Sequence, residues 1–162
     1  MTGPGKNLSA SPIVTVREML PSDVPALSAI LKESPEASSW PEESLLESAH
    51  SGVAWVAEAE GCAIGFLIGR GVLDEFEILN LAVAQCYRRR GIATRLLGTM
   101  AAWTKESGTR RAFLEVRASN AAAMALYVQN SFSPCGRRVR YYQYPVEDAV
   151  VLTRDMEMEG TS

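Results

Sequence analysis

The stretch FEILNLAVAQCYRRRGIAT, residues 76–94, decides the fold. Residues 76–84 form a nearly continuous apolar run, which is typical of a central strand covered on both faces. Apolar residues then recur at helical spacing from Ile92 to Trp103, and Gly108 stands where such a helix ends. The connection between this strand and this helix carries three consecutive arginines followed by a glycine, Gly91.

This connection is interpreted as a loop that grips a diphosphate, from Arg88 to Thr94. The start of a helix carries a partial positive charge and unpaired N–H groups. Arginines placed there destabilise the helix start by like-charge repulsion unless an anion binds between them. Gly91 allows close backbone approach and Ala93 keeps the first turn uncrowded, so successive amides can point at one ligand. The alternative is a solvated arginine run in which Gly91 only lets the chain turn. The glycine pattern of a Rossmann site and the Gly-Lys-Ser/Thr of a P-loop are both absent.

Outward from this stretch, alternating patterns and turn residues predict further strands and helices on both sides. Strands are expected at 13–18, 53–58, 62–72, 111–117, 136–144 and 146–156, and helices at about 24–33 and at 121–130. A further short helix is expected to open within residues 38–43, with Pro41 in its first turn, and to run to about residue 50. Strands alternate with helices in the second half of the chain. This order implies right-handed crossovers and locally parallel pairing, inside a sheet whose first half is antiparallel.

Length and composition indicate one globular domain. The chain has 162 residues, which suffices for one hydrophobic core and not for two ordinary domains. We expect a disordered leader at 1–12, a single domain at 13–158 and a flexible tail at 159–162. No apolar run approaches the roughly 20 residues that cross a bilayer, and the leader lacks the apolar segment of a signal peptide.

Charge and cysteine content exclude several classes of site. The formal net charge of -3 argues against nucleic-acid binding, which requires surplus Lys and Arg. Cys62, Cys86 and Cys135 lack CxxC spacing, and His50 is the single histidine, so neither a disulfide framework nor a zinc site is expected. We expect no metal and no membrane partner. Reduced cysteines without a signal peptide favour a cytoplasmic location.

Two motifs resemble the GNAT superfamily of N-acetyltransferases. Residues 88–93, RRRGIA, match its Q/R-x-x-G-x-G/A signature after an apolar strand, with Arg88 for the commoner glutamine and Ala93 for the commoner second glycine. Residues 114–123, LEVRASNAAA, with Tyr127 resemble the LEVRxSNxxAxxLY segment of the RimI branch, whose members acetylate the N-terminal alanine of a small-subunit ribosomal protein. The resemblance extends from Val14 to Met156.

This resemblance implies an α/β (α+β) GNAT fold and acetyl-CoA as cofactor. The sheet would be mixed but mostly antiparallel, with about seven strands, a parallel splay between the fourth and fifth strands, and about four helices. Backbone groups of one strand would bind the pantetheine arm of the cofactor, and the loop would bind its diphosphate. The implied cofactor-binding residues are Leu81, Ala82, Val83, Arg88, Arg89, Arg90, Gly91, Ile92, Ala93, Thr94, Asn120 and Tyr127.

Acetyl transfer to an amine needs a proton acceptor, because only an uncharged amine attacks a thioester. Glu115 lies inside an otherwise apolar strand, where burial makes a carboxylate a better base, and the resemblance places the RimI base there. Its alternative is a surface glutamate paired with Arg117. Glu77 lies where histone-type GNAT members carry their catalytic glutamate, and its alternative is an exposed residue at a strand entrance. The sequence does not rank the two glutamates.

The departing thiolate needs a proton donor, and the resemblance assigns this role to Tyr127. Tyr127 lies seven residues after Asn120 on the same predicted helix, so the two project from nearly one face. The alternative for Tyr127 is a core tyrosine with its hydroxyl at the rim. Asn120 is expected to cap the helix.

The leading functional hypothesis is acetyl transfer from acetyl-CoA to a protein N-terminal α-amino group, by direct attack in a ternary complex. The alternatives are a GNAT enzyme that acetylates a small-molecule amine and a non-catalytic acyl-CoA-binding sensor. The protein is expected to act as a monomer or homodimer. Residues available to attract or enclose the acceptor are Glu42, Glu43, Glu47, Glu75, Tyr141, Tyr142 and Tyr144.

Overall fold

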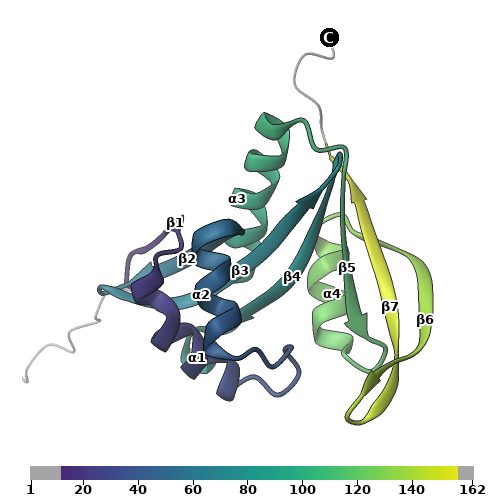
Figure 1. Ribbon diagram of the computed structural model, residues 1–162, viewed down its shortest axis with the longest axis horizontal. Coiled ribbons are helices and arrows are strands. Elements are labelled where there is room, and N and C mark those ends of the chain that lie inside the picture. Colours follow the sequence, from purple (N-terminus) through teal and green to yellow (C-terminus); the bar gives the residue numbers. More distant parts are fainter. Residues whose placement is uncertain (1–11, 157–162) are drawn as a thin grey trace, which may run out of the picture.

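The computed structural model describes residues 12–156, whose strands form one seven-stranded sheet with the order β1-β2-β3-β4-β5-β7-β6 (Figure 1). The strands are β1 (Val14–Glu18), β2 (Val53–Ala59), β3 (Cys62–Val72), β4 (Glu75–Val83), β5 (Arg111–Arg117), β6 (Ser133–Gln143) and β7 (Val146–Asp155). The α-helices are α1 (Val24–Lys32), α2 (Glu42–Ser51), α3 (Ile92–Ser107) and α4 (Ala121–Gln129). Two short 3-10 turns, η1 (Pro21–Asp23) and η2 (Gln85–Tyr87), precede α1 and α3.

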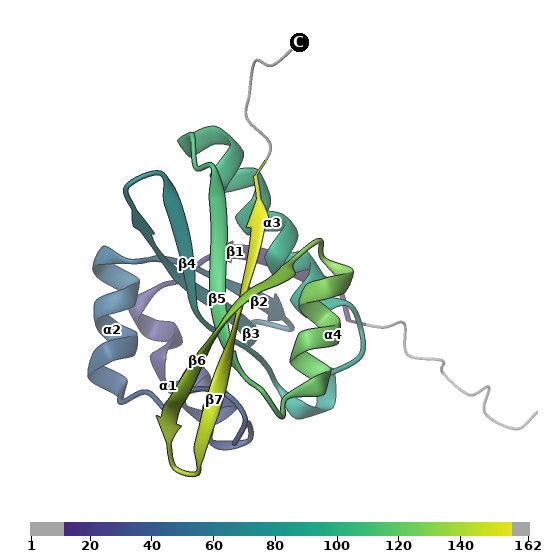
Figure 2. The same ribbon diagram turned by 90° about the vertical axis from the view of Figure 1, so that its right-hand side faces the viewer.

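Helices cover both faces of the sheet, as the apolar run in β4 predicts. Helices α1 and α2 lie on one face, where Leu27 and Leu45 pack in a core with Phe66 of β3 (Figures 1 and 2). Helices α3 and α4 lie on the other face, where Leu97 and Tyr127 belong to the second core. No helix of residues 12–156 is long and apolar enough to cross a membrane.

The sheet splits between β4 and β5, which are its only parallel neighbours among the described strands. The two pair only from Glu75 to Glu77 on β4, against Arg111 to Phe113 on β5. Beyond this point β4 stays paired with β3, and β5 stays paired with β7 along its whole length. The two strands therefore diverge towards their carboxyl ends, which Figure 1 shows as a widening V. The expected parallel splay is confirmed.

A β-bulge in β4 changes which face of the sheet the side chains of its second half occupy. Ile78 pairs with Gly69 and Asn80 with Ile68, so Leu79 is an extra residue on the β4 side. An extra residue shifts the alternation of side chains by one. As a result Phe76 and Ile78 share a core with Leu81 on the α3 face, although their spacing is odd. The bulge lies directly beyond the last residue of β4 that pairs with β5, at the start of the split.

The sequence placed these elements well, with small errors at their ends. The strand expected at 76–84 is β4, and the strand expected from 136 begins three residues earlier, at Ser133. Helix α2 begins at Glu42, after Pro41 in extended backbone. Strand β7 ends at Asp155 rather than Met156. The predicted leader, apart from Pro12, and the tail lie outside the described residues, as do the last two residues of the predicted domain.

Candidate active site

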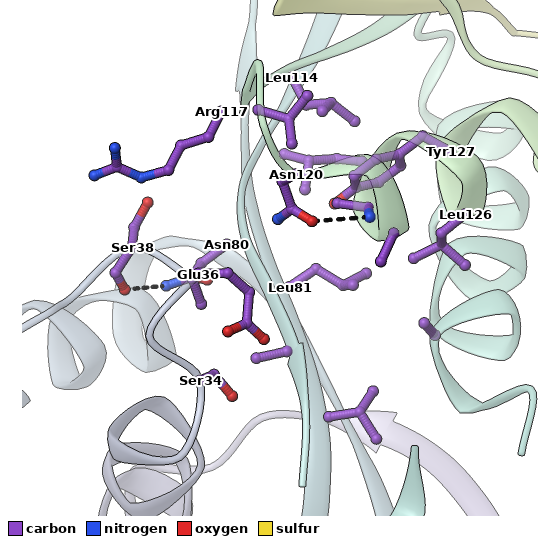
Figure 3. A pocket seen from close by; sticks show the side chains of 18 of the residues that line it. Ser34, Glu36, Ser38, Asn80, Leu81, Leu114, Arg117, Asn120, Leu126 and Tyr127 are labelled. Carbon is purple, nitrogen blue, oxygen red and sulfur yellow. Dashed lines mark hydrogen bonds between the residues drawn. The ribbon is translucent and has the colours of Figure 1, made fainter. Parts of the chain in front are cut away.

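A cleft of about 960 Å³ fills the split between β4 and β5. Its walls come from the carboxyl halves of both strands, the α1–α2 connection, the starts of α3 and α4, and the β6–β7 turn (Figure 3). Because β4 has no strand partner on the β5 side beyond Glu77, its backbone groups there face the cleft. Leu81, Ala82 and Val83 line this edge of the cleft.

The start of α3 forms one end of the cleft and is open to an anion. Gly91 precedes the helix with φ 76°, in the left-handed region that favours glycine. The first intrahelical hydrogen bond runs from the Arg95 amide to the Gly91 carbonyl, at 3.1 Å. No side chain caps the helix, so the amides of Ile92, Ala93 and Thr94 lack partners within it. Free amides at the positive end of a helix dipole are groups that can hold an anion.

The Arg88 side chain forms hydrogen bonds within the protein. Its guanidinium donates to the Val83 carbonyl at 3.2 Å and to the Ser34 hydroxyl at 2.9 Å. It also lies 3.4 Å from the Glu36 carboxylate in the α1–α2 connection. Arg88 therefore fastens this connection to the end of β4, and the anion site consists of amides more than of the Arg88 side chain.

The other two arginines of the loop have freer surroundings. Arg89 lines the cleft and adopts φ 61°, so the backbone turns left-handed at both Arg89 and Gly91. Arg90 does not line the cleft, and its guanidinium lies over the Tyr87 ring at 5.3 Å. Of these three arginines, only Arg89 lines the cleft without a hydrogen bond, ion pair or ring contact of its side chain within residues 12–156.

Glu115 of β5 lines the cleft and forms an ion pair with the edge strand β6. Its side chain is 12% exposed, and its Oε1 lies 2.6 Å from Nε of Arg138. Glu115 also contacts Tyr141, and this interaction, together with burial, raises the pKa of Tyr141 to about 12. The surface pairing with Arg117 that the sequence left open does not occur, because Arg117 pairs with Glu147 instead.

Tyr127 lies across the cleft from the α1–α2 connection, on α4 (Figure 3). Its ring packs on Phe132 with centroids 5.5 Å apart, and burial raises its pKa above the ordinary value. No group of the described residues hydrogen-bonds to the Tyr127 hydroxyl. Asn120 caps α4, as predicted, by accepting a 3.1 Å hydrogen bond from the Ala123 amide (Figure 3). This cap uses only the side-chain oxygen of Asn120, so the side-chain NH₂ group stays available on the wall of the cleft.

Comparison with known proteins identifies this architecture. A sequence model of the acetyltransferase (GNAT) family matches residues 17–132, which is most of the chain. The chain belongs to the GNAT family. It is similar to the [ribosomal protein bS18]-alanine N-acetyltransferase of Escherichia coli K12, with 37% identity over 100 residues, 60% of this chain and 68% of that protein.

Two solved structures extend this similarity over nearly the whole chain. The crystal structure of the Escherichia coli ribosomal-protein-S18-alanine N-acetyltransferase superposes with a TM-score of 0.80 at 30% identity, covering 93% of this chain and 98% of that one. The PaiA N-acetyltransferase of Thermoplasma acidophilum, in complex with coenzyme A, has a TM-score of 0.75 at 18% identity, covering 88% and 99%. As a GNAT member, this protein is an acetyl-CoA-dependent N-acetyltransferase.

Within the GNAT fold, the two glutamates proposed as base occupy different places. Glu77 lies at the paired end of β4, does not line the cleft, and forms an ion pair with Arg70 at 2.8 Å. Glu115 lies beyond the split and lines the cleft. The structure therefore separates the two residues that the sequence could not rank.

The residues that the sequence proposed to attract or enclose the acceptor line this GNAT cleft only in part. Tyr142 and Tyr144 line it, whereas Tyr141 does not, and the ring of Tyr141 lies 5.1 Å from the Tyr142 ring. The carboxylates proposed to attract the acceptor do not line the cleft: Glu42, Glu43, Glu47 and Glu75. Glu36 in the α1–α2 connection lines it instead.

A hydrogen bond that the sequence did not predict holds the α1–α2 connection against β4. Asn80 is buried, and its side-chain NH₂ donates to the Ser38 carbonyl at 3.1 Å (Figure 3). This bond joins the α1–α2 connection to the middle of β4. The signal was present, since Asn80 is the one amide side chain inside the apolar run 76–84, and a buried amide requires a partner.

Proposed function

We propose that this GNAT enzyme acetylates the α-amino group of a protein N-terminus; two of the proteins that it resembles are named as alanine N-acetyltransferases of a ribosomal protein. One observation carries the proposal: a carboxylate, Glu115, and a tyrosine hydroxyl, Tyr127, line the same split between β4 and β5. The free amides of α3 lie in the same cleft. A proton acceptor, a proton donor and a diphosphate site thus share one cavity.

The residues present fit acetyl-CoA. The amides of Ile92, Ala93 and Thr94 would hold its diphosphate at the α3 dipole, with Arg89 adding a positive charge. The open edge of β4 would pair with the amides of the pantetheine arm, as an extra strand pairs with a sheet edge. Acetyl-CoA supplies an acetyl thioester, which this alignment would direct from the start of α3 into the split between β4 and β5.

Proton transfers are assigned to Glu115 and Tyr127. Glu115 takes a proton from the incoming ammonium, directly or through one ordered water, and so produces the uncharged amine. As the N–C bond forms and the C–S bond breaks, Tyr127 donates its hydroxyl proton to the departing sulfur, and the second proton lost by the attacking nitrogen reprotonates Tyr127. Burial raises the pKa of Tyr127, which keeps its hydroxyl protonated before the reaction. An N-terminal amine, with a pKa near 8, loses its proton more easily than a lysine near 10.4, which suits a glutamate as base.

The partner is accordingly a protein with a free N-terminus, and we place the reaction in the cytoplasm. The test is an acceptor panel: the protein with acetyl-CoA and peptides that begin with alanine, the same peptides blocked at the N-terminus but carrying lysine, and small polyamines. We expect turnover of the free N-terminal peptides only. Turnover of polyamines without turnover of any peptide would replace this acceptor by a small amine.

Tyr127→Phe tests the proton donor. Removing the hydroxyl should lower kcat roughly 100-fold, since general acid catalysis contributes about 10²–10⁴-fold. The affinity for CoA should stay within about threefold, because the ring still packs on Phe132. Calorimetry of CoA binding and initial rates measure the two effects. Unchanged kcat would return Tyr127 to a packing role.

Because burial raises the pKa of Tyr127 above its ordinary value of about 10, its proton stays in place through mildly alkaline pH. The rate of the wild-type protein should therefore not fall between pH 8 and 9.5 through loss of this proton. A rate profile over this range checks the assignment.

A further inference from the structure

The side chain of Arg117, at the end of β5, joins three parts of the acceptor side. Its Nη1 donates to the Pro145 carbonyl at 3.2 Å and its Nη2 to the Tyr144 carbonyl at 3.1 Å. Both carbonyls belong to the turn between β6 and β7. The guanidinium also lies over the Tyr142 ring, 4.3 Å from its centroid, so it supports a residue that lines the cleft.

Glu147 extends this arrangement to the helix that carries Tyr127. Its Oε2 lies 3.3 Å from Nη1 of Arg117, and its Oε1 accepts from the Ser119 amide at 2.6 Å. Ser119 directly precedes Asn120, the cap of α4. The side chain and backbone amide of Ser119, together with Arg117, lower the pKa of Glu147, so this carboxylate is an anion at neutral pH.

Both partners of this pair are mostly shielded, which distinguishes them from the surface ion pairs nearby. The side chains of Arg117 and Glu147 are 21% and 18% exposed, whereas Arg137, which pairs with Asp148 on the same hairpin, is 59% exposed. A fork of donors that reaches two carbonyls, a carboxylate and a ring fixes geometry in a way that a lysine cannot.

We propose that Arg117 and Glu147 are positioning residues that set the distance between the acceptor wall of the cleft and the α4 helix. They act through Tyr142 and the β6–β7 turn on one side and through the start of α4 on the other. This inference rests on the proposed function for its kinetic consequence. Its structural consequence, a turn and a helix start that are fastened together, does not depend on the identity of the acceptor.

The kinetic test compares Arg117→Ala and Arg117→Lys with the matched control Arg137→Ala. Loss of hydrogen bonds to a charged group should raise the KM for the acceptor peptide roughly tenfold in Arg117→Ala. Lysine keeps the charge without the fork, so Arg117→Lys should recover only part of this loss. The affinity for CoA should stay within about twofold in all three variants, and Arg137→Ala should match the wild type. An equal loss of CoA and acceptor affinity, or an unchanged acceptor KM, would overturn the positioning role.

A second measurement uses no acceptor at all. Glu147→Gln should accelerate amide hydrogen exchange at both the β6–β7 turn and Ser119, while Arg137→Ala should accelerate exchange at neither. If no peptide is acetylated but Glu147→Gln accelerates exchange at both places, the proposed acceptor is refuted and the positioning role of Arg117 and Glu147 is retained. Peptide turnover with exchange changed at only one of the two places would refute the inference and keep the function.

Discussion

Replacing Glu115 by glutamine should lower kcat with an N-terminal peptide about 100-fold at pH 7. Glutamine keeps the size of the side chain and can still accept a hydrogen bond from Arg138, but it cannot take a proton. A positioned general base contributes about 10²–10⁴-fold, so the lower end of this range is expected for an acceptor with a pKa near 8. Initial rates at saturating acetyl-CoA measure the loss.

The pH dependence separates loss of a base from loss of structure. At pH 9 most of an N-terminal amine is already uncharged, so the deficit of Glu115→Gln should shrink to about tenfold. A deficit caused by a distorted cleft would stay constant with pH. The KM for acetyl-CoA should not change, because the diphosphate site that we propose lies at the start of α3 rather than at β5.

Glu77→Gln is the matched control, since it makes the same substitution on the rival glutamate. Glu77 is paired with Arg70, whose side chain is 61% exposed, and such pairs contribute about 0–1 kcal/mol to stability. We expect kcat within about threefold of the wild type and a small decrease in melting temperature. A large loss in Glu77→Gln with none in Glu115→Gln would transfer the role of base to Glu77.

The fold could be predicted because local signals and global topology agree along this chain. The apolar run 76–84 and the helical spacing after Gly91 fix a strand, a loop and a crossover helix. Two motifs separated by the correct distance then indicated the GNAT family. The splay is consistent with these elements, because β5 pairs in parallel with β4 over only three residues and pairs with β7 along its whole length.

Contacts between distant segments could not be predicted, because periodicity does not encode them. The anchoring of Glu115 by Arg138 depends on the register of β6 on β7, which contains two irregularities. The bulge at Leu79 left no mark in an apolar run whose residues are buried on both faces. Arg88 looked like an anion ligand in the sequence, and only the position of the α1–α2 connection reveals that it binds Ser34.

The largest loss of cofactor binding is expected from Gly91→Glu. A Cβ at this position meets no protein atom within 4 Å, so the new side chain extends freely beside the start of α3. Its carboxylate can accept hydrogen bonds from the amides of Ala93 and Thr94 and repels a diphosphate at the same place. We expect CoA affinity to fall more than about 100-fold, measured by calorimetry.

Two controls isolate the charge from the backbone strain. Gly91→Ala carries the same cost of a side chain at φ 76°, about 1–2 kcal/mol, but adds no charge, so CoA affinity should fall less than about tenfold. S-Acetyl-pantetheine lacks the diphosphate, so the rate with this truncated donor should be nearly equal in the wild type and in Gly91→Glu. Equal losses with both donors would mean that the loop had collapsed. Retained CoA binding in Gly91→Glu would refute the assignment of the α3 amides as the diphosphate site, because a carboxylate and a diphosphate cannot occupy the same few N–H groups at once.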